Sequence, residues 1–300
     1  MSAKVIRLNE LAERIHNETA ELVRSFIYDG GATVPPCIAI LQIEGDMASE
    51  VYLRKKKEAV LSIGGTVRHF VFPKHIDFKI VRRVINDLNN DSLVHGIILQ
   101  LPVPWDATAC KKTLNAIRPD KDIDGLGKEA LSALAEGEFH KSFIPCTPRA
   151  VEMAATELIG DLEGKLVLVI GRSRLVGLPL ALLLQQKWNC TVSIAHSHSD
   201  KLDLDCLSVP ADVIVVATGT PKGIQLTEVT GKTLIIDVGV NKDAEGVLCG
   251  DVDHASLNDE VSVTASPGGI GLLTVEALCQ NLVLAWRNQW IEAHPVDPSF

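Results

Sequence analysis

The sequence predicts an α/β protein with two domains, of which the second is a doubly wound parallel sheet. Short runs of β-branched and aliphatic residues alternate with amphipathic helical patterns along the chain. This alternation is typical of parallel sheets that are covered by helices on both faces. The length of 300 residues agrees with about two domains at roughly 150 residues each.

The apolar runs predict strands at 37–43, 66–72, 96–100, 166–170, 191–195, 213–217, 234–238 and 261–264. Helices are expected between them at 8–27, 49–63, 78–89 and 179–188, and a long last helix should run from 274 to about 291. The alternation restarts near Pro145–Pro148, and Gly268–Gly271 is typical of a second hinge. We therefore expect one domain at 1–147 plus 272–300 and another at 148–271, flanking a cleft. The C-terminal helix would then return to the first domain.

Composition excludes several classes of protein. A net charge of −9 argues against a nucleic-acid binder, and no apolar run approaches the roughly 18 residues that would span a membrane. The first helix carries too many acids for a transit peptide, which favours the cytoplasm, with an organelle matrix as the alternative. The seven cysteines form no C-x-x-C pair, as expected of thiols in a reducing compartment. His196 and His198 lack partners at zinc-ligand spacing, so no metal is predicted.

A glycine turn, Gly171-x-Ser173-x-x-x-Gly177, follows the strand at 166–170 and enters a helix through Pro179. Glycines let the backbone approach phosphate, and a helix N-terminus supplies N–H donors. The turn differs from G-x-G-x-x-G in its central serine, and by itself it also fits an ordinary structural turn. In this position it indicates a dinucleotide site on a Rossmann-like domain.

The strand after this turn ends in Ala195-His196-Ser197-His198-Ser199 and has no acid before Asp200. A site for NAD usually has an acid here for the ribose hydroxyls, whereas Arg172 and hydroxyl groups suit a 2′-phosphate, which favours NADP. The alternative is an ordinary solvated loop. The next two strands end in Ala217, Thr218 and Gly219 and in Val238 and Gly239. Residues of this kind at strand ends fit either a ligand that lies over the sheet edge or tight turns alone.

Ser49, Tyr52 and Lys56 follow helical spacing and share one face. A lysine that transfers protons must be partly neutral near pH 7, and both burial and neighbouring cations such as Lys55 and Lys57 favour this. The alternative is a solvated basic helix.

Two further segments favour a binding site over a solvated surface. Gln100 ends a buried strand and precedes the rigid loop Leu101-Pro102-Val103-Pro104. The segment 118–125 contains Asp120, Asp122 and Asp124, without the pattern of a calcium loop. It is either a solvated loop or the source of a carboxylate for an amidine-like group.

These motifs resemble one enzyme family. They are Tyr52-x-x-x-Lys56, the segments 96–104 and 119–125, Pro145-Cys146-Thr147-Pro148, Gly171-Arg172-Ser173 and Pro267-Gly268-Gly269-Ile270-Gly271. In order and spacing, from about Val34 to Ala285, they are similar to the bifunctional methylene-tetrahydrofolate dehydrogenase/methenyl-tetrahydrofolate cyclohydrolases.

The resemblance implies NADP-dependent oxidation of 5,10-methylene-tetrahydrofolate, followed by hydrolysis of the methenyl product to 10-formyl-tetrahydrofolate in the same cleft. Lys56 would be the acid/base residue, held by Gln100, while Tyr52 stacks on the substrate and Asp124 binds the pterin. The implied substrate-binding residues are Ser49, Tyr52, Gln100, Leu101, Asp124, Thr147, Pro267, Gly268 and Gly269. The implied cofactor-binding residues are Gly171, Arg172, Ser173, Val176, Gly177, His196, Ser197, Ala217, Thr218, Gly219, Val238, Gly239 and Thr274.

The resemblance also implies a homodimer that binds tetrahydrofolate derivatives, with no nucleic acid or membrane partner. The sequence departs from the family pattern at Ser266, Leu272-Leu273 and Leu126-Gly127. No G-x-x-x-x-G-K-[ST] loop is present, so the synthetase activity of larger family members is not expected. Two alternatives are a shikimate-dehydrogenase-like enzyme, which also pairs a lysine with an aspartate, and a module that binds folate or NADP without turnover.

Overall fold

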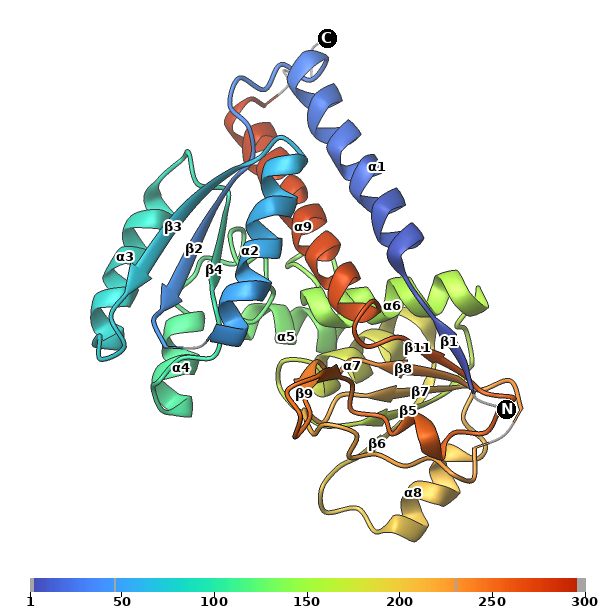
Figure 1. Ribbon diagram of the computed structural model, residues 1–300. Helices are drawn as coiled ribbons and strands as arrows, with labels where there is room; N and C mark the ends of the chain where they lie inside the picture. Colours follow the sequence, from blue (N-terminus) through green and yellow to red (C-terminus); the bar gives the residue numbers. More distant parts are fainter. Residues whose placement is uncertain (1–2, 46, 230, 296–300) are drawn as a thin grey trace. The chain divides into compact units, whose positions relative to one another are not determined.

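A computed structural model describes residues 3–45, 47–229 and 231–295 (Figure 1). The chain divides into two compact units. The six-stranded unit contains the chain up to Glu13 together with Leu134–Gly137 and Thr147–Thr274. The three-stranded unit contains Arg14–Ala133, Glu138–Cys146 and the chain from Val275 onward.

The three-stranded unit is built on a parallel sheet in the order β3-β2-β4. Its strands are β2 (Cys37–Ile43), β3 (Thr66–Phe72) and β4 (Gly96–Leu99). All residues of the central strand β2 and of the edge strand β4 are buried, because helices cover the sheet and leave these strands no solvated face. The helices beside it are α2 (Met47–Ser62), α3 (Phe78–Asn90) and α4 (Ala107–Leu114). The apolar face of α3 packs on the sheet through Val81, Ile85 and Leu88.

The six-stranded unit has a fully parallel sheet in the order β1-β11-β8-β7-β5-β6. Its strands are β1 (Lys4–Ile6), β5 (Leu166–Ile170), β6 (Thr191–Ala195), β7 (Val213–Val216), β8 (Leu234–Asp237) and β11 (Ser262–Thr264). From β5 the chain first adds β6 on one side and then crosses to β7 on the other. Such a reversal opens a crevice at the carboxyl ends of the strands, where ligands bind in open α/β sheets.

The remaining elements of the six-stranded unit are α7 (Gly177–Trp188), α8 (Lys201–Ser208), the short antiparallel pair β9 (Asn241–Lys242) and β10 (Leu248–Cys249), and the 3₁₀ turn His254–Ser256. Four helices contain residues of both units: α1 (Asn9–Tyr28), α5 (Lys128–Glu136), α6 (Cys146–Ile159) and α9 (Ile270–Ala293). None of the described helices is long and apolar enough to cross a membrane.

The carboxyl-terminal part of α9 belongs to the three-stranded unit, as predicted for the last helix. Trp286 is completely buried, and its indole N–H donates to the carbonyl oxygen of Val34 at 3.0 Å. The ring of Phe26 in α1 meets Trp286 edge to face at a centroid distance of 5.0 Å. An aromatic pair of this geometry packs α1 and α9 together.

The α/β fold class with a Rossmann-like parallel sheet is confirmed, and each predicted strand is present with ends within one residue of the expectation. The domain assignment differs at the N-terminus, because β1 pairs with β11 in the register Lys4↔Ser262 and joins the six-stranded unit. We expected these first residues in the other domain. Three residues, of which two are exposed, carry too short an apolar pattern to be recognised as a strand.

Candidate active site

Lys56 is the buried member of its lysine run. Its side chain is 6% exposed, whereas Lys55 lies in solvent. The Nζ atom donates to the Oε1 atom of Gln100 at 3.3 Å and lies 5.3 Å from the centroid of the Tyr52 ring. The alternative of a solvated basic helix is therefore excluded for the face that carries Lys56.

Gln100 is held in the orientation that Lys56 requires. Its Nε2 group donates to the carbonyl oxygen of Leu101 at 2.9 Å, which leaves Oε1 for the lysine. Gln100 follows directly after β4, and α2 follows β2 with one short loop between them. The carboxyl ends of neighbouring parallel strands therefore bring these side chains together. The side chain of Ser49 lies outside the described residues.

The three aspartates of segment 118–125 have separate environments. Asp120 forms an exposed ion pair with Arg118 at 2.7 Å. Asp122 is buried, and it accepts N–H groups from Gly127 at 2.7 Å and Leu126 at 3.4 Å. Burial raises the pKa of Asp122 to about 7. Only Asp124 approaches Lys56, with its Oδ2 atom 3.9 Å from Nζ.

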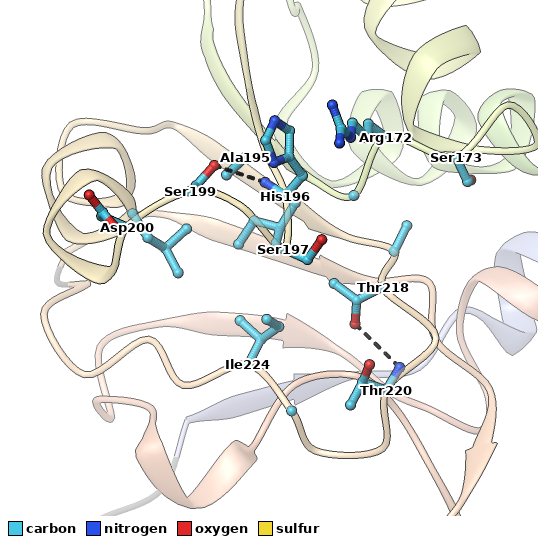
Figure 2. A pocket seen from close by; sticks show the side chains of 15 residues that line it. Arg172, Ser173, Ala195, His196, Ser197, Ser199, Asp200, Thr218, Thr220 and Ile224 are labelled. Carbon is cyan, nitrogen blue, oxygen red and sulfur yellow. Dashed lines mark hydrogen bonds between the residues drawn. The ribbon is translucent and has the colours of Figure 1, made fainter.

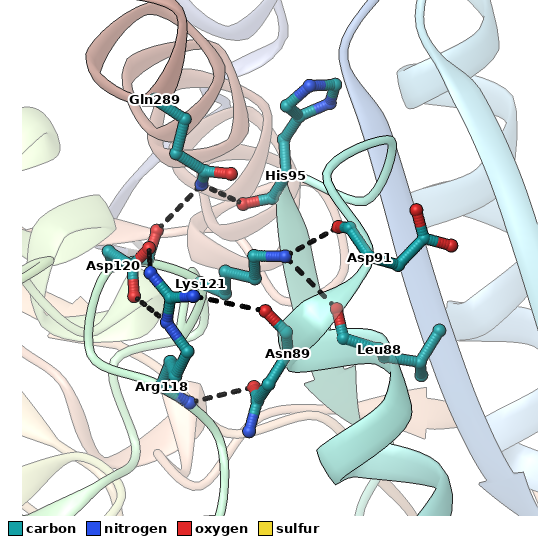
Figure 3. A network of polar contacts seen from close by, with 8 residues as sticks. All are labelled: Leu88, Asn89, Asp91, His95, Arg118, Asp120, Lys121 and Gln289. Carbon is teal, nitrogen blue, oxygen red and sulfur yellow. Dashed lines mark hydrogen bonds and ion pairs between the residues drawn. The ribbon is translucent and has the colours of Figure 1, made fainter. Parts of the chain in front are cut away.

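A polar network fixes the loop that carries Asp124 (Figure 3). The Nζ atom of Lys121 donates to the carbonyl oxygens of Leu88 at 3.1 Å and Asp91 at 2.7 Å, at the C-terminus of α3. Gln289 of α9 donates to the carbonyl oxygens of His95 and Asp120 at 2.8 and 3.1 Å. Burial lowers the pKa of Lys121. Sequence reasoning missed this lysine, because its role depends on burial.

Asn281 of α9 supports the same loop from within the three-stranded unit. Its Nδ2 group donates to the carbonyl oxygens of Ile123 at 2.9 Å and Ile144 at 3.0 Å. The residue before Asp124 and the segment that leads to Cys146 are thereby tied to one helix. The sequence offered no signal for this contact, which joins residues 158 positions apart.

A second site lies at the carboxyl ends of β5, β6 and β7 in the six-stranded unit. It is a cavity of about 510 Å³. Figure 2 shows Arg172 from the loop after β5 and His196 and Ser197 from the loop after β6 around this cavity. The predicted residues that line it are Gly171, Arg172, Ser173, His196, Ser197, Ala217 and Thr218. Asp200, Leu204, Thr220, Gly223 and Ile224 also line it and were not predicted.

The two glycines of the turn are required by close backbone packing. Gly171 has φ +125°, and a Cβ atom there would lie 2.3 Å from the carbonyl oxygen of Ala217. A Cβ atom on Gly177 would meet the carbonyl oxygen of Gly171 at 1.9 Å. Ser173 accepts the N–H of Val176 at 3.1 Å. These contacts leave a concave backbone turn without side chains at its glycines. A phosphate-binding turn needs such a shape, so that the backbone can approach the phosphate.

The other predicted residues do not line this cavity. These residues are Val176, Gly177, Gly219, Val238, Gly239 and Thr274. The hydroxyl group of Thr274 donates to the carbonyl oxygen of Ile270 inside α9. Thr147, Pro267, Gly268 and Gly269 belong to the six-stranded unit, not to the unit of Lys56. Among the described residues, no three His, Cys, Asp or Glu side chains are grouped as they would be around a metal ion.

Comparison with known proteins decides the family. Residues 6–124 match the catalytic domain of tetrahydrofolate dehydrogenase/cyclohydrolase, and residues 145–290 match its NAD(P)-binding domain. The bifunctional protein FolD of Agathobacter rectalis is 35% identical over 278 residues, which cover 92% of this chain and 96% of the relative. The chain belongs to the tetrahydrofolate dehydrogenase/cyclohydrolase family.

Solved structures of tetrahydrofolate dehydrogenase/cyclohydrolases agree with this fold. The FolD enzyme of Campylobacter jejuni superimposes with a TM-score of 0.87 at 30% identity, covering 96% of this chain and 99% of that one. The Trypanosoma brucei enzyme, complexed with NADP and an inhibitor, gives a TM-score of 0.86 at 28% identity, with 96% and 98% coverage.

The chain is accordingly an NADP-dependent methylenetetrahydrofolate dehydrogenase and methenyltetrahydrofolate cyclohydrolase of one-carbon metabolism. The residues of the cavity fit NADP, because the glycine turn leaves room for a phosphate and Arg172 supplies a permanent positive charge. The shikimate-dehydrogenase-like alternative is excluded by the family.

Proposed function

We propose that Lys56 is the acid/base residue of the hydrolysis and that Gln100, Asp124 and Tyr52 complete the folate site. One observation carries this proposal. A buried lysine donates to an amide oxygen at 3.3 Å and lies 3.9 Å from a carboxylate, at the carboxyl end of a parallel sheet. Lysines are almost never fully buried unless they are paired, and this one is paired with two polar side chains where ligands bind in open α/β sheets.

Each residue has a role that its chemistry permits. Asp124 accepts two N–H groups from the aminopyrimidinone edge of the pterin, because a carboxylate matches such an edge with paired hydrogen bonds. The half-buried ring of Tyr52 stacks on the aminobenzoyl ring of the folate. Leu101 follows Gln100, and the amide hydrogen bond between them keeps Gln100 directed at Lys56.

Hydride transfer depends mainly on position. Bound NADP supplies the hydride acceptor, and the protein holds the two reactants in contact. The six-stranded unit contributes Arg172, Ser173, His196 and Ser197 to this binding. We propose that Thr147, Pro267, Gly268, Gly269 and Thr274 act on the folate and nicotinamide as the resemblance implies.

Hydrolysis begins on the methenyl cation, which is already electrophilic. A water oxygen forms a bond to the one-carbon centre while the neutral amine of Lys56 takes a proton from that water. The bond from this carbon to N5 of the folate then breaks, and a proton returns to N5. One proton is released overall, and 10-formyl-tetrahydrofolate is the product. General-base assistance of this kind is typically worth about 10²–10⁴-fold.

The test replaces Lys56 and uses its exposed neighbour as a matched control. Lys56→Gln should lose hydrolysis of added methenyl-tetrahydrofolate by at least about 100-fold, followed through the decay of its absorbance, while its circular dichroism stays unchanged. Lys55→Gln, which alters a solvent-exposed lysine of the same helix, should hydrolyse at the normal rate. Normal hydrolysis by Lys56→Gln would remove the assignment, and absence of both activities from the unmodified protein would favour a module that only binds.

We further propose a cytoplasmic homodimer. The seven cysteines support the location, because all of them are free thiols, as expected in a reducing compartment. The resemblance supports the dimer, and β6 provides an edge strand whose Ile194 side chain is exposed. Sedimentation equilibrium tests the dimer, and a mass of 32.4 kDa at micromolar concentration would contradict it.

A further inference from the structure

Asp251 is a completely buried carboxylate directly behind the NADP cavity. Its Oδ2 atom accepts the backbone N–H groups of Thr218 at 2.5 Å and Gly219 at 2.9 Å. Its Oδ1 atom accepts from the Nδ2 group of Asn241 at 2.7 Å. Thr218 itself lines the cavity. The carboxylate is thus satisfied by three donors, of which two belong to the loop that follows β7.

A second buried carboxylate holds the first in place. Asp237 accepts the N–H groups of Asp251 and Gly239 at 3.0 Å through Oδ1, and that of Val252 at 3.0 Å through Oδ2. Burial raises the pKa of Asp237. A Cβ atom on Gly250 would lie 1.8 Å from Asp237, and one on Gly239 would lie 2.2 Å from Asp251. The carboxylates therefore occupy space that only glycines leave free.

This arrangement decides what the Thr218–Gly219 loop can offer a ligand. Loops at the carboxyl ends of parallel strands commonly bind phosphate through backbone N–H groups. Here the N–H groups of both residues are directed at Asp251, and a buried negative charge stands behind them. The loop keeps its carbonyl oxygens, which accept hydrogen bonds and repel anions. Its chemistry suits hydroxyl and amide donors.

We propose that Asp251 is a positioning residue of the NADP site, which makes the Thr218–Gly219 loop an acceptor surface for the ribose hydroxyls of the nicotinamide half. The phosphates are thereby left to the glycine turn and Arg172. Asp251 orients the dinucleotide in the crevice without touching it. Arg172, His196 and Ser197 follow β5 and β6 and lie where the 2′-phosphate of the adenosine half would bind. The Thr218–Gly219 loop follows β7, on the other side of β5, so we assign it to the nicotinamide half. This inference rests on the NADP site described above.

The experiment compares the single variant Asp251→Asn with a double variant in which residues 251 and 241 exchange their side chains. In Asp251→Asn, the loop N–H groups lose a charged acceptor, and with Asn241 in its present orientation two donors face each other. In Asp251→Asn with Asn241→Asp, the amide oxygen accepts from the loop and the amide N–H₂ donates to the new carboxylate. The exchange restores each donor and acceptor, so a folded double variant is expected.

The readout separates the two halves of the cofactor. For Asp251→Asn we expect the KM for NADP and the inhibition constant of nicotinamide mononucleotide to rise about tenfold, as for loss of a hydrogen bond to a charged group. The inhibition constant of 2′,5′-ADP should change less than about twofold. A merely structural role of Asp251 would instead weaken the binding of both fragments to the same extent. Hydrolysis of added methenyl-tetrahydrofolate should be unchanged. The double variant should recover most of the NADP affinity.

Several outcomes would overturn the proposal. Equal weakening of both fragments would mean general damage to the unit, and unchanged affinity for nicotinamide mononucleotide would remove the positioning role. Lack of recovery in a folded double variant would also contradict it. If 2′,5′-ADP fails to inhibit the unmodified enzyme, the assignment of the NADP cavity itself fails, which is a different result.

Discussion

The Nζ atom of Lys56 lies 3.9 Å from the Oδ2 atom of Asp124, and the two side chains are only 6% and 19% exposed. The pair joins α2 to the segment between α4 and α5. Asp124 and Gln100 therefore share Lys56 as a partner at the proposed folate site. Binding of the pterin to Asp124 would draw the carboxylate toward the substrate, and Gln100 would then remain as the partner of Lys56.

Asp124→Asn should weaken folate binding and thereby lower both activities. The change preserves the shape of the side chain but removes the charge that binds the pterin edge, and it leaves Lys56 without its carboxylate. We expect KM for methylene-tetrahydrofolate to rise at least about tenfold, since hydrogen bonds to charged groups contribute about 1.5–3 kcal/mol. Steady-state kinetics measure this value. Asp120→Asn is the control, because Asp120 pairs with Arg118 at the surface. A normal KM in Asp124→Asn would contradict the assignment.

Arg172→Gln should change the preference between dinucleotides. Arg172 lines the cavity beside His196 and Ser197, and a guanidinium group binds a 2′-phosphate that NAD lacks. The KM for NADP is expected to rise about 10- to 100-fold, since each 1.4 kcal/mol is a factor of ten. The KM for NAD should stay within about twofold. Arg174→Gln serves as the control, and equal loss with both dinucleotides would show that Arg172 does not recognise the 2′-phosphate.

His95 should make the stability depend on pH. It is 4% exposed, its Nδ1 atom accepts the N–H of Cys37 at 3.0 Å, and burial lowers its pKa from 6.5 to about 4. Above pH 6.5 the ring is neutral in both states, and its contribution to stability is complete. As the pH falls from 6.5 toward 4, the unfolded chain takes up a proton that the folded chain does not, so stability is lost at about 1.4 kcal/mol per pH unit.

The measurement compares urea unfolding of the protein and of His95→Gln between pH 4.5 and 7.5. The variant should lack the loss at low pH, so the difference between the two free energies of unfolding should shrink as the pH falls. Asp122 has the opposite effect on stability over an overlapping pH range. Its raised pKa means that ionisation is unfavourable in the folded state, so the stability falls as the pH rises toward 7. Because both proteins contain Asp122, its effect cancels when one free energy of unfolding is subtracted from the other. A constant difference would mean that His95 titrates normally.

The fold was accessible from the sequence because its strands are buried on both faces. Cys37–Ile43 and Leu166–Ile170 read as continuous apolar runs, and their observed ends equal the expected ones. Lys4–Ile6 was not recognisable, since it pairs with Ser262–Thr264, which lies far away in the chain. Such pairing is a property of the folded topology and leaves little trace in three residues.

The site divides in the same way. Lys56, Gln100, Arg172 and the glycine turn were predicted because chemistry and close backbone approach restrict those positions to few residue types. The supporting groups were not. Lys121, Asp251 and Asn281 act through backbone groups far away in the chain, and polar residues of the same types are common on surfaces.

The sequence by itself determined the α/β class, the eight strands that it predicted, the dinucleotide turn and the lysine face, since these depend on local patterns of apolar and small residues. Only the tertiary structure decided which of three neighbouring aspartates meets Lys56, which lysine of three is buried, and that Asp251 takes the N–H groups of Thr218 and Gly219. Burial and hydrogen-bond partners arise when distant segments meet, and identical side chains acquire different charges and roles from those surroundings.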